Sequence, residues 1–306
     1  MSSPSLGPLR LGFVGLGNIG GAVCANLLAD GHTVTVFDLD LARVEAQRAS
    51  GGQPAGSPAE VAAAADWTLL SLPSPEVVET VAEQWLARAG SSGKVLVDLT
   101  TNSPATVRAV GARLASAGTH LVEAPVTGGA PGARNRTLVF ITGGDEETVA
   151  EVRPLLDTLG RATFYMGPWG CGNVGKLVNS LMAFTTMVVS LEGLALGAKS
   201  GLDLRTLLEM VRTSGGAHSY LERRVEEINE RSRPTEFSME LAAKDAGLML
   251  ETGRQVGLPM PVASAVHQVL AFAKAQGLAG RDISDLVEVI ERAAAVELRL
   301  PPAAQS

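Results

Sequence analysis

The sequence predicts an α/β protein of two domains, an N-terminal doubly wound sheet followed by an all-α domain. The chain has 306 residues, which is about twice the length of a typical domain. Short apolar runs alternate with alanine-rich helical stretches as far as Gly167, and only helical patterns follow. We therefore expect one domain over residues 1–167 and a second over residues 168–306.

Apolar runs rich in β-branched residues mark the strands of the first domain. The expected strands are 9–14, 33–37, 68–72, 94–99, 119–123, 136–142 and 162–166. Because helical stretches separate them, we expect a parallel sheet that is covered on both faces.

The expected helices between these strands include 20–30, 58–65, 75–89 and 104–117. Pro58, Pro75 and Pro104 each follow a serine, a pattern typical of an N-cap with proline at the first helical position.

The second half consists of expected helices punctuated by glycines. Their ranges are 172–197, 204–213, 219–230, 236–256, 261–276 and 283–296. The longest apolar stretch, 181–198, is interrupted by Thr185, Thr186, Ser190 and Glu192. We therefore do not expect it to span a bilayer.

Composition excludes several classes of protein. With 46% hydrophobic and 19% charged residues, the chain is neither disordered nor a coiled coil. A net charge of −7 gives no attraction to nucleic acid or to an anionic membrane. Cys24 and Cys171 stand in no metal-binding or redox spacing, so we expect no metal. With no secretory signal pattern at the start, a cytoplasmic location is expected.

A glycine motif indicates a dinucleotide site in a Rossmann domain. The motif follows the first apolar strand, opens a helix and reads Gly15-Leu16-Gly17-Asn18-Ile19-Gly20. Gly15 would make the tight turn, Gly17 would let the backbone approach the pyrophosphate, and Gly20 would pack helix against strand. The start of the helix would supply amide donors to the phosphates.

Asp38 follows the second strand, where an acid accepts hydrogen bonds from the adenosine ribose hydroxyls. Its charge would repel a 2′-phosphate, which favours NAD over NADP. Arg43 lies close enough in sequence to leave NADP open.

Three further segments resemble a known family. Residues 123–133 read EAPVTGGAPGA, residues 170–179 read GCGNVGKLVN, and Phe237 precedes a Lys244-Asp245 pair. Together with the glycine motif, they resemble the β-hydroxyacid dehydrogenases, the family of 3-hydroxyisobutyrate dehydrogenase and tartronate semialdehyde reductase. The resemblance runs from about residue 9 to residue 292.

The resemblance implies hydride transfer between a nicotinamide cofactor and a small 3-hydroxy acid or its semialdehyde. Thr127, Gly128 and Gly129 would hold the substrate carboxylate, for which a hydroxyl and unshielded amides are suitable partners. Lys176 would be the general acid/base. A nearby oxidised nicotinamide and desolvation would both lower the pKa of such a lysine.

The resemblance also assigns residues that line the two ligands. On the cofactor side these are Leu72, Pro73, Val77, Thr101 and Lys244; on the substrate side they are Asn179, Ser180, Phe237 and Asp245. Phe237 could instead be a core residue, and Lys244 and Asp245 could be a pair of solvent-exposed charges on a helix.

Two positions depart from the family. Ser180 replaces the second residue of the usual asparagine pair, which puts the usual substrate geometry in doubt. Arg136 stands where the family commonly has glycine. Arg134 and Arg136 are either surface cations or, if they face the cleft, ligands of a substrate with a second anionic group.

Two alternatives remain at this stage, an imine reductase-like enzyme and a non-catalytic nucleotide-binding regulatory protein. Imine reductases usually lack a lysine at the position of Lys176, which favours the dehydrogenase. The expected partner is a small carboxylated substrate, without nucleic acid or membrane. By the resemblance, the chain forms a homodimer or homotetramer.

Overall fold

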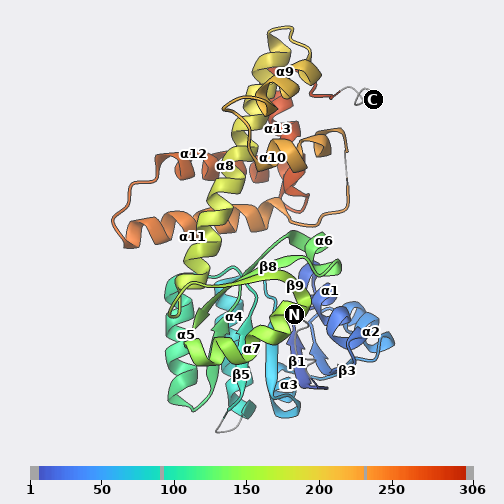
Figure 1. Cartoon of the computed structure of the whole chain (residues 1–306), viewed down its shortest axis with the longest axis vertical. Coiled ribbons are helices and arrows are strands. Elements are labelled where there is room, and N and C mark those ends of the chain that lie inside the picture. The colour runs from blue at the N-terminus through green and yellow to red at the C-terminus, as the bar shows by residue number, and fades with distance from the viewer. Residues whose placement is uncertain (1–6, 90–92, 231–232, 301–306) are drawn as a thin grey trace. The chain divides into compact units, whose positions relative to one another are not determined.

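The computed structural model describes residues 7–89, 93–230 and 233–300. The chain divides into two compact units, Met1–Lys176 and Leu177–Ser306, whose elements are labelled in Figure 1. The boundary expected at residue 167 follows the last strand. By packing, the first unit extends further and includes the beginning of the next helix.

The first unit is built on one mixed sheet with the strand order β3-β2-β1-β4-β5-β6-β8-β7 and with β9 beside β8. Its strands are β1 (Arg10–Val14), β2 (Thr33–Phe37), β3 (Gln53–Pro54), β4 (Trp67–Leu70), β5 (Val95–Asp98), β6 (His120–Glu123), β7 (Val126–Thr127), β8 (Leu138–Gly144) and β9 (Gly160–Tyr165). All seven expected strands are present, and the two-residue strands β3 and β7 were not anticipated.

Six neighbouring strands, from β3 to β6, are parallel as expected. The expectation of a wholly parallel sheet is wrong at β8, which is antiparallel to both β6 and β7. Only residues 128–137 connect β7 to β8, and a parallel crossover needs about a dozen residues or more.

Helices cover both faces of the sheet, because alternate strand residues face two separate cores. Phe13, Leu69 and Val97 pack with one set of helices, and their neighbours Val14 and Leu70 pack with the other. The first set is α1 (Asn18–Ala29), α2 (Leu41–Ala49) and α7 (Glu146–Leu159); the second is α3 (Pro58–Ala64), α4 (Pro75–Ala89) and α5 (Pro104–Ser116).

Serine hydroxyls accept hydrogen bonds at the starts of all three helices for which a serine cap was predicted. The Ser57 hydroxyl accepts from Glu60 N, the Ser74 hydroxyl from Val77 N at 3.4 Å, and the Ser103 hydroxyl from Ala105 N. The helices α2, α7 and the short α6 (Gly129–Arg134) were not among those named from the sequence.

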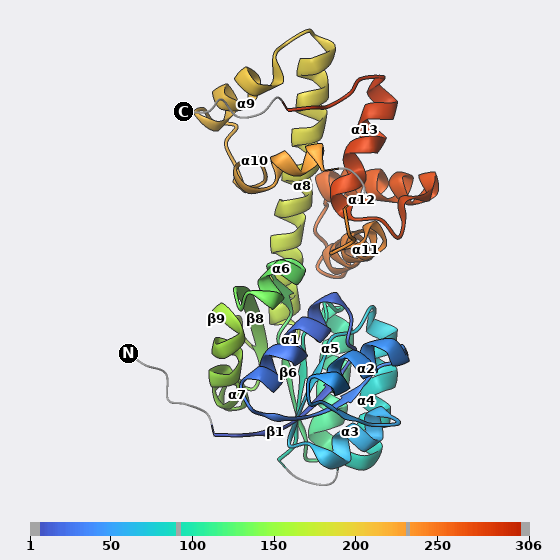
Figure 2. The same cartoon turned by 90° about the vertical axis from the view of Figure 1, so that its right-hand side faces the viewer.

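The second unit is helical. It contains most of α8 (Cys171–Lys199), followed by α9 (Leu204–Arg212), α10 (Ser219–Arg223), α11 (Met239–Gln255), α12 (Pro261–Ala273) and α13 (Leu286–Ala294). Figure 2 shows α9 on one side of α8 and α11, α12 and α13 on the other. The expected helix 219–230 is interrupted at Arg224, after which a 3-10 segment, Val225–Asn229, follows.

The longest helix, α8, passes the length and composition test for a membrane-crossing helix, with a mean hydropathy of 1.6 over its most apolar 18 residues. Its polar residues therefore do not by themselves decide the question, and the expectation that α8 does not cross a bilayer stays a prediction. Phe184, Met187, Leu191 and Leu194 of α8 are nonetheless buried in the core of the second unit. A helix at the centre of a helical core needs such a composition.

We predict that Gly20→Ala destabilises the first unit by at least about 2 kcal/mol. A Cβ at Gly20 would lie 2.0 Å from the Gly15 carbonyl oxygen, which is backbone and cannot turn away. Urea unfolding followed by far-UV circular dichroism measures the change.

Gly247→Ala, inside α11, is the matched control. Its Cβ would find its nearest neighbour at 3.9 Å, so the helix should gain up to about 1 kcal/mol. Equal effects of the two alanines would contradict the close packing at Gly20.

Candidate functional site

The predicted cofactor residues follow the ends of neighbouring parallel strands. Gly15 follows β1, Asp38 follows β2, Leu72 and Pro73 come after β4, and Thr101 comes after β5. They therefore lie along the same edge of the sheet. Strand β1 stands between β2 and β4, where the order of connection reverses. In open α/β sheets, dinucleotides bind at this point.

The three glycines of the motif differ in how closely the fold surrounds them. Gly15 has a φ of +90°, and a Cβ there would lie 2.3 Å from Ser71 O. Gly20 packs against Gly15 O, as described above. Around Gly17 the nearest atom to a Cβ would be Arg43 Nη1, at 3.7 Å. The open space at Gly17 fits the approach of a pyrophosphate to the backbone.

Helix α1 begins directly on this motif. Gly17 is its N-cap residue, and within the described part of the chain no side chain caps the helix there. Asn18 and Ile19 are its first helical residues. The amides and positive dipole end of α1 thus suit the phosphates of a dinucleotide.

The Asp38 carboxylate lies beside the glycine turn. It accepts hydrogen bonds from Leu16 N (2.6 Å) and Asp40 N (2.8 Å). Arg43 Nη1 lies 3.8 Å from Asp38 Oδ2, and the Arg43 side chain is 51% exposed compared with 11% for Asp38. The acid is therefore held in place while the guanidinium remains at the surface.

The loops after β4 and β5 are joined to each other. Leu72 N donates to the Thr100 hydroxyl at 3.0 Å, and Thr101 is the next residue. Pro73 is exposed, as is Val77 in the first turn of α4. All four predicted lining residues of the first unit thus belong to two adjacent loops and the helix start that follows one of them.

The turn Thr127-Gly128-Gly129 lies between β7 and α6. Thr127 pairs with Val139 of β8, so the sheet holds the threonine backbone. Gly128 and Gly129 have φ angles of +120° and +62°, values that favour glycine. The turn brings a hydroxyl and successive backbone amides together.

Glu123, at the end of β6, was not proposed as a site residue from the sequence. Its side chain is fully buried. Oε1 accepts from Gly170 N (2.6 Å) and Gly172 N (3.1 Å), and Oε2 accepts from Asn173 N (2.9 Å) and Asn173 Nδ2 (2.7 Å). Burial raises the pKa of the Glu123 carboxyl above its usual value. The feature of the sequence that could have identified Glu123 is an acidic residue at the end of an apolar strand.

Lys176 is partly exposed and lies on α8 three residues beyond Asn173. Asp98 pairs in register with Glu123 on the neighbouring strand. Burial raises the pKa of Asp98 to about 6. The first turn of the helix that carries Lys176 therefore hydrogen-bonds to one of two buried acids that lie side by side on neighbouring strands.

The remaining predicted residues belong to the second unit. Asn179 is exposed on α8, whereas Ser180 is 2% exposed. The Phe237 ring stacks on Phe184 with centroids 6.1 Å apart. Lys244 Nζ lies 2.9 Å from Oδ1 of the buried Asp245. Phe237 thus contacts the helical core, and Lys244 and Asp245 form an ion pair.

Arg136 has a structural role. Its guanidinium donates to both Asp30 oxygens, at 2.7 and 2.8 Å, and to the carbonyl oxygens of Asn26 and Thr158. Of the two readings, this geometry favours the surface cation over the substrate ligand. Its φ of +55° lies in the left-handed region that favours glycine.

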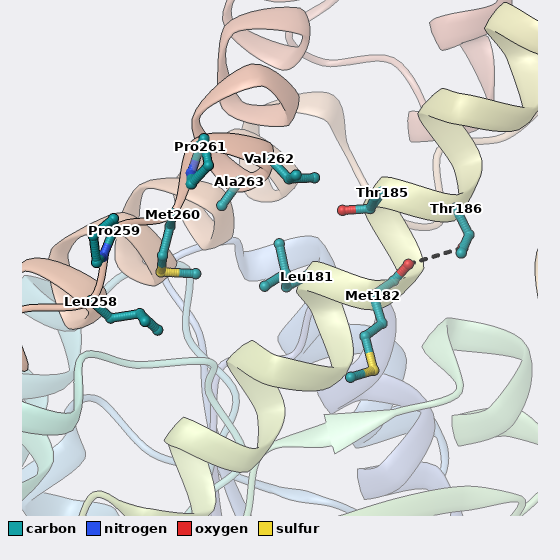
Figure 3. A pocket seen from close by; sticks show the side chains of 10 residues that line it. All are labelled: Leu181, Met182, Thr185, Thr186, Leu258, Pro259, Met260, Pro261, Val262 and Ala263. Carbon is teal, nitrogen blue, oxygen red and sulfur yellow. Dashed lines mark hydrogen bonds between the residues drawn. The ribbon is translucent and has the colours of Figure 1, made fainter.

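The second unit contains an apolar groove of about 460 Å³. Figure 3 shows Leu181 and Thr185 pointing from α8 toward residues 258–263. Its lining residues are Leu181, Met182, Thr185, Thr186, Leu258, Pro259, Met260, Pro261, Val262 and Ala263. The predicted substrate residues are not among them. Among residues 7–89, 93–230 and 233–300, no group of three His, Cys, Asp or Glu side chains could hold a metal ion.

Comparison with known proteins covers both units. Residues 10–167 match the NAD binding domain of 6-phosphogluconate dehydrogenase. Residues 170–290 match the family described as NAD-binding of NADP-dependent 3-hydroxyisobutyrate dehydrogenase.

Individual relatives match over nearly their whole length. The chain is 34% identical over 293 residues to 2-(hydroxymethyl)glutarate dehydrogenase of Eubacterium barkeri, covering 95% of this chain and 97% of the relative. It is 32% identical over 284 residues to NAD-dependent L-serine dehydrogenase of Pseudomonas aeruginosa, with coverages of 90% and 95%.

Among solved structures, 3-hydroxyisobutyrate dehydrogenase of Mycobacterium tuberculosis with L-serine matches with a TM-score of 0.85 at 29% identity. This match covers 93% of this chain and 99% of the other. The fold, the motifs and these matches agree from β1 to α13. The chain therefore belongs to the β-hydroxyacid dehydrogenase family of 3-hydroxyisobutyrate dehydrogenase, and it is an oxidoreductase with an NAD(P)-binding domain.

Proposed function

We propose that this oxidoreductase is an NAD-dependent dehydrogenase of a small 3-hydroxy acid that also reduces the matching semialdehyde. The observation that carries the proposal is the sheet edge at β1, where the glycine turn, Asp38 and the loops after β4 and β5 follow neighbouring strands. The named relatives act on 2-(hydroxymethyl)glutarate and L-serine, which supports a short carboxylated alcohol as substrate.

The charges around Asp38 support NAD as the cofactor. Arg43 lies 3.3 Å from Asp40 and 3.8 Å from Asp38, so two carboxylates accompany one guanidinium. A ribose with free hydroxyls can donate to Asp38, whereas a 2′-phosphate would bring two more negative charges to the same place. When bound, the dinucleotide supplies or accepts the hydride at its nicotinamide ring.

Thr127, Gly128 and Gly129 would bind the substrate carboxylate. The hydroxyl of Thr127 and the amides of the two glycines, which carry no side chains of their own, are suitable donors for a carboxylate. Asn179, Phe237 and Asp245 are the proposed substrate contacts of the second unit, and Lys244 its proposed cofactor contact. Ser180 is a further proposed substrate contact, although its side chain is 2% exposed in this structure.

Lys176 would transfer the proton. In alcohol oxidation, its neutral amine accepts the hydroxyl proton as the carbonyl forms; in reduction, its ammonium donates a proton to the oxygen. Its partly exposed position in the second turn of α8 supports this role.

We also infer a homodimer or homotetramer, located in the cytoplasm. The support for assembly is a row of exposed apolar side chains on α8: Val178, Met182, Val189 and Leu196. Met182 also borders the groove of Figure 3. The support for a reducing compartment is that Cys24 and Cys171 are both free thiols.

We predict that Lys176→Ala lowers kcat about 10²-fold or more while the dinucleotide Kd stays close to that of the unchanged protein. Lys176→Arg should be as inactive, because guanidinium keeps the charge but does not release its proton near neutral pH. Initial rates with L-serine and 3-hydroxyisobutyrate, and fluorescence titration with NADH, measure the two quantities.

Lys199→Ala, at the other end of α8, is the control and should leave kcat unchanged. An active Lys176→Ala protein would remove this lysine from the mechanism.

We predict that Asp38→Ala reduces the ratio of kcat/KM for NAD to kcat/KM for NADP by at least about tenfold, a change of roughly 1.4 kcal/mol. Removing the Asp38 carboxylate removes its repulsion of the 2′-phosphate of NADP and leaves the Arg43 guanidinium available to attract that phosphate. Asp66→Ala, which removes an equal charge from an exposed pair with Arg10, should leave the ratio unchanged. An unaltered ratio in Asp38→Ala would overturn the choice of NAD.

A further inference from the structure

The first turn of α8 is capped by a residue from the sheet and not by its own sequence. Gly170 precedes the helix and has no side chain. The amides of Gly172 and Asn173, which an N-cap side chain normally satisfies, donate to Glu123 of β6. The position of this turn is therefore set by the end of β6.

Asn173 extends the connection to a second loop. Its Nδ2 donates to Glu123, while its Oδ1 accepts from Asn102 N at 2.6 Å. Asn102 Nδ2 in turn lies 3.3 Å from Asp98 Oδ2, and Asp98 Oδ1 accepts from Thr100 N at 2.9 Å. The four residues of this chain of hydrogen bonds are at most 1% exposed: Glu123, Asn173, Asn102 and Asp98. This buried network joins the start of α8 to the loop that contains Thr101.

Two glycines make room for the Glu123 carboxylate. A Cβ at Gly143 would lie 2.3 Å from Glu123 Oε1, and a Cβ at Gly172 would lie 3.0 Å from Glu123 Cδ and 2.7 Å from Ile141 O. The close fit leaves Glu123 no room to shift, so the helix start has a single well-defined place.

We propose that Glu123 and Asn173 are positioning residues, which fix Lys176 relative to the cofactor loop at Thr101. Lys176 lies one helical turn beyond Asn173, and a movement of this first turn would carry its side chain along. The inference rests on the proposed function in one respect, the role of Lys176 in proton transfer.

Glu123→Gln tests the proposal with little change in shape. A glutamine presents one oxygen and one NH₂ group in place of two oxygens. At least two of the four N–H groups that now donate to Glu123 would therefore face the NH₂ group, which is itself a donor. We expect kcat to fall by roughly 10- to 100-fold, with the dinucleotide Kd largely unchanged. Asn173→Ala, which leaves Glu123 three amide donors and also removes the acceptor of Asn102 N, should give a fall of the same kind and serves if Glu123→Gln does not fold.

Asp145→Asn is the matched control. Asp145 caps α7 of the same unit by accepting from Thr148 N at 2.9 Å, so this change also removes a carboxylate from a helix start. Its kcat should equal that of the unchanged protein.

The decisive readout is the double variant Glu123→Gln/Lys176→Ala. If Glu123 acts through Lys176, the glutamine should cause no further loss of kcat in the Lys176→Ala protein. An equal loss in both backgrounds, or a Glu123→Gln protein as active as the unchanged one, would overturn the positioning role. Activity retained in Lys176→Ala alone would instead overturn the proposed proton transfer.

Discussion

The buried carboxylate of Glu123 is the interaction on which the described site depends, because it joins the edge of the sheet to the helix that carries Lys176. Ionised carboxylates are costly to bury unless several donors surround them. Here four N–H groups surround it, and a helix N-terminus adds its positive dipole end. The glycines at 143 and 172 are explained largely by the room that this carboxylate needs, before any substrate is considered.

The proposed site residues are distributed over both units. The proposed dinucleotide, carboxylate and proton-transfer residues belong to the first, and the proposed contacts Asn179, Phe237, Lys244 and Asp245 belong to the second. Relatives with different named substrates match the chain over nearly its whole length at similar identity. A shared fold with changes at a few side chains that contact the substrate is enough to explain why these relatives have different substrates. In this chain, Ser180 is the position at which the sequence resemblance predicts such a change.

Local patterns could be predicted from the sequence, and long-range contacts could not. The glycine motif, Asp38 and the serine caps act within one turn or one strand–helix unit, so their spacing identified them. Glu123 contacts residues 47 to 50 positions away, and Arg136 binds Asp30 at a separation of 106. No spacing rule reaches that far. The antiparallel direction of β8 could not be predicted because it follows from the short connection before that strand. The strand β7 and the helix α6, which precede β8, were not anticipated from the sequence.

Hydride transfer between substrate and cofactor can be followed by the transfer of deuterium from the substrate to the nicotinamide ring. L-serine and 3-hydroxyisobutyrate, each carrying two deuterium atoms at C3, would be incubated with the protein and NAD, and the NADH analysed by mass spectrometry and NMR. We expect one deuterium at C4 of the dihydronicotinamide ring. NADH without deuterium, or turnover of a cyclic imine with neither acid oxidised, would contradict it.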